Sequence, residues 1–387
     1  MKILYGVVGE GMGHATRSRV VIEHLLSCGH TVRVVVSGRA HDFLRSAFRG
    51  KSNIAIEEIH GLHFVYDDNA IDKSESLLSN LDQASAGIKK NIGVYRKVAE
   101  AGFSPELVIS DFESWAYLYG RNHRLPVVSI DNMQVINRCH HPQEIIGKRG
   151  LDGWLAKLAV KIKMPGAYHY LMTSFFFPPV RKKRTTLVPP ILRQEILAAK
   201  REPGEHVLVY QTAAANSALI PRLQKLPWVF RLYGMGRSGK EKNVTLCDFS
   251  ATGFVDDLRT ARAVIAGGGY SLMGEAVSLG VPMLSVPLEK QFEQELNARY
   301  LAHLGYGAWA PELSTELVES FLSRTDCFAH ALASFPAQDN SMTLGCLDEL
   351  LCAASHNEPR PETLEHPAMG KYQGALLPDE ETGSTVQ

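Results

Sequence analysis

The chain has 387 residues, of which 45% are hydrophobic and 21% charged, and it carries 41 Lys+Arg against 41 Asp+Glu. This is the balance of a soluble globular protein, and the length favours two domains. The neutral bulk charge gives no support to nucleic-acid binding. The six cysteines are scattered without a Cys-x-x-Cys pair, which favours a reducing, cytoplasmic location and indicates neither a disulfide framework nor a metal site. No apolar run approaches the ~20 residues of a membrane-spanning helix.

The first 36 residues predict a βαβ unit. Residues 2–8 form an apolar strand, residues 9–14 a glycine-rich turn, and residues 31–36 a second strand. Between them lies a helix with Val21, Ile22 and Leu25 on one face. A unit of this kind opens a parallel sheet in an α/β domain.

The opening turn allows a dinucleotide-binding alternative. Its glycines, Gly9, Gly11 and Gly13, are spaced G-x-G-x-G rather than G-x-G-x-x-G. The second strand is followed by Ser37-Gly38-Arg39 instead of the acidic residue that binds a ribose. An NAD(P)-binding oxidoreductase is therefore an alternative that the spacing disfavours.

His14 is the candidate general base. It lies at the start of the helix after the turn, where the end of a strand presents ligands, and imidazole titrates near neutral pH. Asp111, at the end of an apolar strand, is a candidate orienting partner, and Asp131 ends a similar strand. The plain alternatives are a solvated or capping histidine and acids that cap the following helices.

Two stretches between these motifs admit more than one interpretation. Residues 60–100 are polar and favour a mobile loop near an acceptor. Residues 148–164 predict an amphipathic helix, and its apolar side either packs on the sheet or docks on an anionic membrane surface. The basic run at residues 181–184 adds positive charge to the second interpretation.

A linker at Pro189-Pro190 divides the chain. After it, five short apolar segments predict the strands of a second sheet, at residues 205–210, 228–233, 244–246, 263–266 and 283–286. Residues 315–335 and 341–354 predict closing helices. We thus expect one domain at 1–188, a second at 189–355 and a disordered tail at 356–387, which is rich in Pro, Glu, Gly and Thr.

The stretch at 263–276 carries the strongest signal. A buried strand leads into Gly267-Gly268-Gly269 and then a helix, whose free N–H groups and positive dipole end favour a phosphate or pyrophosphate. Such turns also occur in α/β domains without a ligand. The polar run at 289–298, after the next strand, suits a ligand rich in hydroxyl groups and favours a nucleotide-sugar site.

Two motifs together resemble glycosyltransferases of the GT-B type. One is Gly-Glu-Gly-Met-Gly-His-Ala-Thr-Arg-Ser at residues 9–18, and the other is the acid-Gln-x-x-Asn-Ala signature, which reads Glu-Gln-Glu-Leu-Asn-Ala at 293–298. The similarity covers most of residues 1–355. It extends to the peptidoglycan N-acetylglucosaminyltransferase that acts on a lipid-linked precursor, to UDP-sugar transferases of plants and animals, and to a group of bacterial and archaeal transferases. The resemblance implies an α/β fold of two Rossmann-like domains whose parallel sheets face each other across a cleft. It makes residues 1–188 the N-terminal acceptor-binding domain and residues 189–355 the C-terminal nucleotide-sugar-binding domain.

The resemblance also implies roles for individual residues. On the acceptor side, His14 would deprotonate the acceptor and Asp111 would orient it. On the donor side, Glu275 would bind the ribose, while Glu293 and Gln294 would hold the sugar. The predicted acceptor-binding turn is Gly11, Met12 and Gly13, and the other donor-binding residues are Gly268, Gly269, Tyr270 and Ser271 at the pyrophosphate and Phe254 and Val255 near the base.

The family resemblance implies a reaction in which a sugar moves from a nucleoside-diphosphate donor, expected to be UDP-linked, to an acceptor hydroxyl that can belong to a lipid or cell-envelope precursor. Retaining GT-B enzymes often carry a second Glu eight residues after the ribose-binding one, and Met283 stands there, so we expect inversion. No cofactor or metal is expected, because backbone amides would stabilise the leaving diphosphate. A UDP-sugar epimerase of the same fold and a non-catalytic nucleotide-sugar sensor remain alternatives. We expect a cytoplasmic protein that can lie on the inner face of the membrane.

Overall fold

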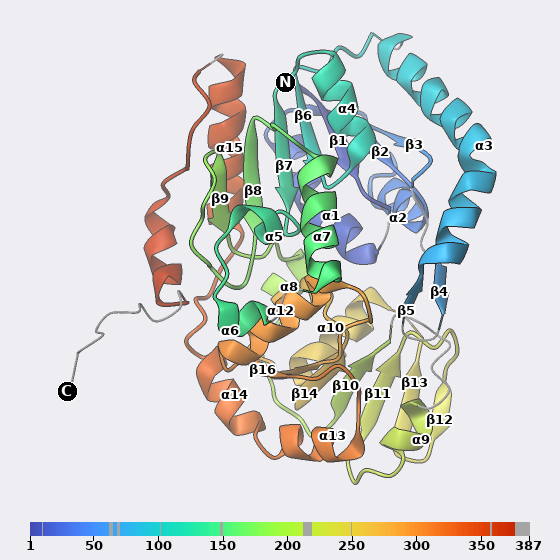
Figure 1. Ribbon diagram of the computed structural model, residues 1–387, viewed down its shortest axis with the longest axis vertical. Helices are drawn as coiled ribbons and strands as arrows, with labels where there is room; N and C mark the ends of the chain where they lie inside the picture. Colours follow the sequence, from blue (N-terminus) through green and yellow to red (C-terminus); the bar gives the residue numbers. More distant parts are fainter. Residues whose placement is uncertain are drawn as a thin grey trace.

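The computed structural model describes residues 1–9, 11–61, 65–67, 70–100, 102–147, 150–211, 219–248, 250–356 and 358–375 (Figure 1). They form two sheets of seven strands each, one in either half of the chain, with helices on their faces. The arrangement confirms the predicted α/β architecture of two Rossmann-like halves.

The first sheet is parallel throughout and has the order β3-β2-β1-β6-β7-β8-β9. Its strands are β1 (Lys2–Val7), β2 (Thr31–Val36), β3 (Ile54–Glu58), β6 (Leu107–Asp111), β7 (Val127–Asp131), β8 (His169–Thr173) and β9 (Thr185–Val188). Its helices are α1 (Met12–Ser27), α2 (Arg39–Ala47), α3 (Lys73–Glu100), α4 (Ser114–Asn122), α5 (Val135–Arg138), α6 (Gln143–Ile146) and α7 (Leu151–Lys163), and a separate ribbon pairs β4 (Val65–Asp67) with β5 (Ala70–Asp72).

The second sheet has the order β12-β13-β11-β10-β14-β15-β16, and only its edge strand β12 runs antiparallel. Its strands are β10 (Val207–Tyr210), β11 (Phe230–Tyr233), β12 (Gly239–Glu241), β13 (Val244–Cys247), β14 (Ala263–Ala266), β15 (Met283–Ser285) and β16 (Gly307–Trp309). The helices of this half are α8 (Gln194–Leu197), α9 (Leu219–Leu223), α10 (Ala251–Thr260), α11 (Tyr270–Ser278), α12 (Phe292–His303), α13 (Thr315–Leu322) and α14 (Thr325–Leu332), followed by α15 (Ser341–Ser355) and a 3₁₀ helix (Pro367–Ala375).

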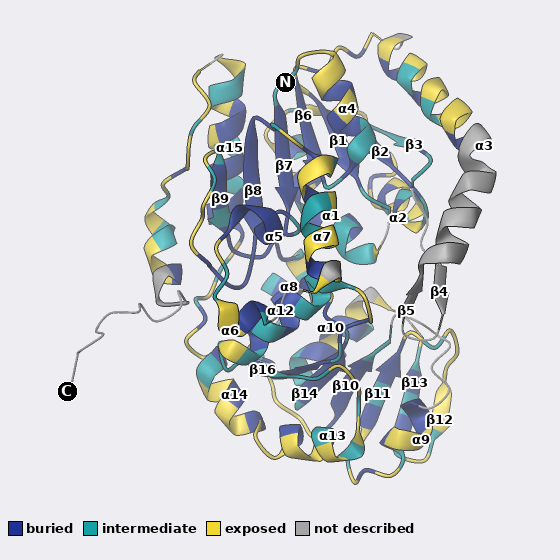
Figure 2. Cartoon of the chain, viewed as in Figure 1, coloured by how far each residue is buried: buried dark blue, intermediate teal, exposed yellow. Residues whose placement is uncertain are grey.

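Both sheets reverse their strand order next to the first strand of the half. In the first sheet β1 lies between β2 and β6, and in the second β10 lies between β11 and β14. Ligands of open α/β sheets bind at the carboxyl ends of the strands at such a point. The central strands β6 and β7 are buried along their whole length, since helices cover both faces, and their polar residues stand at or near their carboxyl ends; Figure 2 shows the strands buried between helices with exposed outer sides.

The chain crosses between the halves twice. After α14 it returns to the first sheet, where α15 packs beside β8 (Figure 1). At the crossing, the Asn340 side chain accepts a hydrogen bond from the Leu192 amide (2.8 Å) and donates one to the Leu192 carbonyl (2.7 Å). The Thr343 hydroxyl also donates to the Pro189 carbonyl (3.2 Å). The two crossing segments are therefore bonded to each other.

The expectation of a disordered tail from residue 356 needs correction for residues 358–375. Leu364 is 2% exposed and Tyr372 4%, and the Tyr372 ring lies 4.9 Å from that of Phe177 between centroids. The Thr185 amide donates to the Glu362 carbonyl at 3.1 Å. Because the tail is mostly polar, the sequence did not indicate that Leu364 and Tyr372 are buried. These two side chains hold the tail along the edge strand β9. Residues 376–387 lie outside the described residues.

One prediction for the first half also needs correction, and the structure bears on the two interpretations of residues 148–164. The stretch expected to be a loop contains α3, a helix of 28 residues, whose Val94 and Val98 are buried at i, i+4 spacing. Helix α7 forms as predicted, but its apolar residues Trp154 and Ile162 are 57% and 65% exposed, so they do not pack on the sheet. Within the described residues, none of the helices is both long and apolar enough to cross a bilayer.

Candidate active site

The strand register brings His14 and Asp111 together. Strands β1 and β6 pair with Val7 opposite Asp111, so the turn after β1 and the carboxylate at the end of β6 meet at one edge of the sheet. Gly11, at a φ of 84°, leads into α1 with a left-handed backbone that favours glycine. The His14 Nδ1 lies 2.8 Å from the Asp111 Oδ1. The structure thus brings the predicted base and its predicted partner into contact.

Asp111 has two further partners that the sequence reasoning missed. Arg17 donates from Nε to Oδ2 (2.8 Å) and from Nη2 to Oδ1, and the Ser18 hydroxyl donates to Oδ2 (3.0 Å). Burial alone would raise the pKa of Asp111, but Arg17 and His14 hold it well below its usual range. The available signal was the spacing: Arg17 lies one helical turn after His14, on the same face of α1.

The second candidate acid, Asp131, has a different environment. It accepts hydrogen bonds from the Ser129 hydroxyl (2.6 Å) and the Gln134 amide (2.8 Å), which makes it a local cap after β7. Burial raises its pKa. Of the two strand-end acids that the sequence offered, the one that contacts His14 is Asp111.

The predicted phosphate-binding turn faces α1. Helix α11 begins at Tyr270 after Gly269, and a Cβ on Gly13 would lie 2.3 Å from the Ser271 hydroxyl, so the first turns of α1 and α11 are in contact. Met12 and Gly13 form the start of α1 at this contact. No atom lies within 4 Å of a Cβ placed on Gly269, which leaves space beside the backbone at that point.

Gln294 holds the glycine turn in place. Its Oε1 accepts hydrogen bonds from the amides of Gly268 and Leu288, both at 3.1 Å, and its Nε2 donates to Gln291 (2.8 Å). A Cβ on Gly268 would lie 2.3 Å from the Gln294 carbonyl oxygen, which explains why glycine stands there. The Gln294 side chain therefore fixes the turn directly.

Glu293 connects the two halves. Its Oε1 accepts hydrogen bonds from the side chains of Asn132 and Asn297, each at 2.7 Å. Asn132 follows β7 in the first half, and its Oδ1 accepts from the Arg17 Nη1 (3.3 Å). Burial raises the pKa of Glu293, and the two amide donors oppose that shift. Asn132 was not among the predicted residues, because only the packing of the two halves brings it to Glu293.

Glu275 is paired with Arg193. The Glu275 carboxylate accepts from the Arg193 Nε (2.7 Å) and Nη2 (2.9 Å), and both side chains are largely buried. Arg193 stands in the linker just before α8. Glu275 thus connects helix α11, on the predicted donor side, to the linker. Its contact with a ribose stays a prediction.

Phe254 and Val255 lie inside the second half. They belong to α10, and the Phe254 ring packs edge-on against Tyr210 and Tyr233, at centroid distances of 5.8 and 5.1 Å. Both side chains are buried in the core. Contact of these two residues with a nucleotide base stays a prediction.

A group of potential metal ligands lies at the other end of α1. Among the described residues, His24, Cys28 and Asp348 place one donor atom each within 4.8 Å of one another. The His24 Nε2 lies 2.8 Å from the Asp348 Oδ1, which links α1 to α15. The sequence reasoning overlooked this grouping, because Asp348 is distant along the chain. The group lies more than two helical turns from His14 and takes no part in the candidate site.

Two doubly wound sheets, a His–Asp pair at the end of one and a glycine-rich helix start facing it from the other, define a glycosyltransferase of the GT-B class. Residues 1–326 match the family described as "Glycosyl transferase family 1", and the chain belongs to this family. The protein is therefore a nucleotide-sugar-dependent glycosyltransferase.

Relatives and solved structures agree with this assignment. An uncharacterized glycosyltransferase of Methanosarcina acetivorans is 26% identical over 336 residues, covering 79% of this chain and 85% of its own. Another from Methanosarcina mazei is 26% identical over 360 residues, covering 83% and 90%. The fold resembles LpCGTa in complex with UDP (TM-score 0.64, 14% identity, covering 92% and 99%) and MurG of Acinetobacter baumannii (0.57, 16%, covering 91% and 99%).

Proposed function

We propose that this enzyme moves a sugar from a nucleoside-diphosphate donor, UDP-linked, to an acceptor hydroxyl, with inversion and without a metal or other cofactor. The observation that carries the proposal is the 2.8 Å contact between His14 and Asp111 directly across from the start of α11. A direct displacement needs a base for the acceptor and a group that stabilises the leaving diphosphate, and here a candidate for each lies at the contact between α1 and α11.

The chemistry uses one proton and one leaving group. The acceptor hydroxyl gives its proton to the Nε2 of His14, and its oxygen bonds to the anomeric carbon of the donor as the bond to the diphosphate breaks. The negative charge that develops on the diphosphate faces the amides of Gly269, Tyr270 and Ser271 and the positive end of α11. Asp111 keeps the imidazole oriented through Nδ1.

The choice of donor is supported by the ligands of the structural neighbours. LpCGTa was solved with UDP and VinC with DTDP, and both ligands are pyrimidine nucleoside diphosphates. Glu293 and Gln294 lie next to the glycine turn, where the sugar of such a donor would sit.

Calorimetric titration with UDP, TDP, GDP and NAD tests the donor site. We expect binding of UDP or TDP and none of NAD. Binding of NAD alone would overturn the proposal in favour of a reductase, and failure to bind any of the four would remove the donor site. Turnover of a UDP-sugar without any acceptor would instead indicate an epimerase.

We further propose that α7 docks on an anionic membrane surface, which would place a lipid-linked acceptor within reach. The apolar residues Trp154, Leu155 and Ile162 are exposed on this helix.

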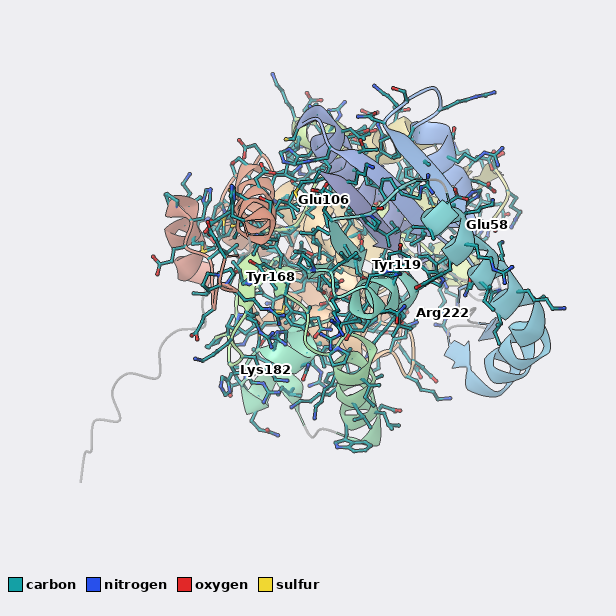
Figure 3. The ribbon with its side chains drawn as sticks, turned by 90° about the horizontal axis from the view of Figure 1, so that it is seen from above. Glu58, Glu106, Tyr119, Tyr168, Lys182 and Arg222 are labelled. Carbon is teal, nitrogen blue, oxygen red and sulfur yellow. The ribbon has the colours of Figure 1, made fainter. Side chains whose placement is uncertain are left out.

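Lys182, labelled in Figure 3, lies on the same side of the molecule as α7. Partial burial lowers the pKa of Lys182 to about 8, and the charges of Arg181, Arg138, Lys161 and Lys157 add to this effect. Lys157 and Lys161 belong to α7 itself, so they lie on the same helix as the exposed apolar residues. Apolar side chains rimmed by cations complement an anionic lipid surface.

Co-sedimentation with vesicles tests the docking. We expect binding to phosphatidylglycerol-containing vesicles, weak binding to pure phosphatidylcholine, and at least a tenfold loss in a Trp154→Ser/Ile162→Ser variant. Val229→Ser, which removes an exposed apolar residue of the other half, is the control. Equal binding of the double variant and the control would refute the docking surface.

A further inference from the structure

Arg17 shares the carboxylate of Asp111 with His14. The guanidinium makes a two-pronged contact, with Nε on Oδ2 and Nη2 on Oδ1, and the side chain is buried. His14 Nδ1 approaches the same Oδ1, at 2.8 Å. The Arg17 Nη2 and the His14 Nδ1 therefore converge on one oxygen atom, and these two nitrogen atoms lie 2.7 Å apart.

This convergence has an electrostatic consequence for the ring. A protonated imidazole would place a second positive charge against the guanidinium inside a buried site, where like charges repel strongly. The other groups that face His14 are Lys163 of α7, which also disfavours the charged ring, and Asp111 of β6, which favours it. The start of α11 brings the neutral Ser271 against Gly13, the residue before His14. Burial and Arg17 together lower the pKa of His14.

We propose that Arg17 is a positioning residue for the base: its guanidinium fixes the Asp111 carboxylate and keeps His14 neutral, with the proton on Nδ1 and the lone pair of Nε2 turned to the acceptor. The inference rests on the proposed role of His14 as the base. A buried His–Asp pair alone stabilises imidazolium, which has no lone pair to accept a proton. Arg17 supplies the compensating charge that leaves the ring available.

The competing hypothesis is the other neutral tautomer of His14, with its proton on Nε2. If the Arg17 Nη2 donated to a bare Nδ1, the ring proton would lie on Nε2 and the acceptor would face a donor instead of a base. The two tautomers of neutral histidine differ in the ¹⁵N shifts and couplings of the ring nitrogens. They can therefore be distinguished in the protein without measuring catalysis.

The first experiment is an NMR titration of the protein with ¹⁵N-labelled histidine, with His14→Gln used to assign the His14 signals. We compare the wild type with two variants. Arg17→Gln removes the charge, and Arg17→Lys keeps the charge but loses the two-pronged contact with Asp111. Arg19→Gln is the matched control, since Arg19 is a half-exposed cation on the same helix that pairs with Glu23.

In the wild type and in the Arg19 control we expect the Nδ1–H tautomer and a His14 pKa below its usual value. Arg17→Gln should raise that pKa by about one to two pH units, the usual effect of a neighbouring charge. Arg17→Lys should leave the pKa near that of the wild type. A proton on Nε2 in the wild type, or an unchanged pKa in Arg17→Gln, would overturn the proposal.

The pH profile of transfer gives the functional readout. The acid limb of kcat/KM should move to higher pH by the same one to two units in Arg17→Gln, so that the loss of activity relative to the wild type grows as the pH falls from 8 and approaches about tenfold to a hundredfold only at a pH below the pKa values of both proteins. Arg17→Lys should lower kcat at every pH without moving the limb, which keeps the inference testable if the Gln variant does not fold. A uniform loss without a shifted limb in Arg17→Gln would make Arg17 merely structural. If the NMR results hold but His14→Ala still transfers sugar at a near-normal rate, the proposed role of His14 as the base fails and the effect of Arg17 on the ring stands.

Discussion

Asn132 donates a hydrogen bond of 2.7 Å to the carboxylate of Glu293, across the boundary between the two halves of the molecule. Asn297 donates to the same oxygen atom, so this Oε1 is fully engaged. Glu293 is also the residue that the acid-Gln signature assigns to the donor sugar. A sugar hydroxyl that binds this oxygen must take the place of Asn132 or Asn297, and we expect it to displace Asn132, because Asn297 belongs to the same helix as Glu293.

Removal of Asn132 should strengthen donor binding. An exchange of one hydrogen bond to a charged group is worth about 1.5 kcal/mol, which corresponds to roughly a tenfold decrease in the Kd for the UDP-sugar in Asn132→Ala. Calorimetry measures it, and UDP itself should bind unchanged, because it lacks the sugar. Asn122→Ala, which removes an exposed amide of α4, is the control. Equal or weaker sugar-nucleotide binding in Asn132→Ala would contradict the competition.

Loss of His14 should abolish transfer and spare the donor site. A positioned general base contributes about 10²- to 10⁴-fold, so His14→Ala should lose at least a hundredfold in kcat while its Kd for UDP stays within about twofold. His330→Ala, at an exposed position of α14, is the control. Steady-state kinetics with the best acceptor found decides the matter, and near-normal turnover would remove His14 from the mechanism.

The Glu275–Arg193 pair should show strong coupling in stability. Both partners are about nine-tenths buried, so removal of one leaves the other charge without compensation, at a cost of about 3 kcal/mol in the free energy of unfolding. The pair Glu275→Gln/Arg193→Met should cost less than the sum of the two single changes. Urea denaturation of the four proteins measures the cycle, and additive losses would mean that the two side chains do not interact.

Glu275 also allows a separate test at the donor site. If its carboxylate turns to the ribose when a nucleotide is bound, Glu275→Ala should weaken UDP binding, while Arg193→Met should preserve it. Calorimetry compares the two variants. An unchanged UDP affinity in Glu275→Ala would limit this residue to its contact with the linker.

Stability should fall in acid because of His169. This side chain is buried in β8 between the Thr186 hydroxyl (2.9 Å) and the Pro361 carbonyl (3.2 Å), and burial lowers its pKa from 6.5 to about 4. Between these two pH values the unfolded chain binds a proton that the folded chain does not, so stability decreases as the pH falls, by up to about 3 kcal/mol.

The His169→Asn variant should flatten this dependence between pH 7 and pH 4.5, whereas His330→Asn, at an exposed position, should keep it. Urea midpoints at the two pH values provide the measurement. A slope in His169→Asn as steep as that of the wild type would assign the acid sensitivity to other groups.

Local patterns in the sequence predicted most of the two sheets and one contact of the site. The strands are short runs of branched apolar residues between glycines and prolines, and such runs specify buried parallel strands without distant information. The His14–Asp111 contact could be predicted because both residues follow strands that a parallel sheet ends at a common edge. Asp131 satisfied the same rule, and only the structure distinguishes the two acids.

The contacts that could not be predicted join residues that are far apart in the sequence, or depend on how a helix is placed against its sheet. Asn132 and Glu293 are 161 residues apart, and Arg193 and Glu275 are 82 apart, so no local period marks either pair. The apolar side of α7 was visible in the sequence, but the pattern does not say whether a sheet or solvent faces it. Arg17 was near enough to be noticed, yet its hold on Asp111 depends on how α1 lies over β6.

The double crossing between the halves has a mechanical consequence. Because Asn340 bonds both the amide and the carbonyl of Leu192, the two crossing segments cannot shift independently. A rotation of one half against the other would therefore have to turn both crossing segments together, and a twist that separated them would have to break the hydrogen bonds of Asn340. In such a rotation the residues farthest from the crossings would travel most.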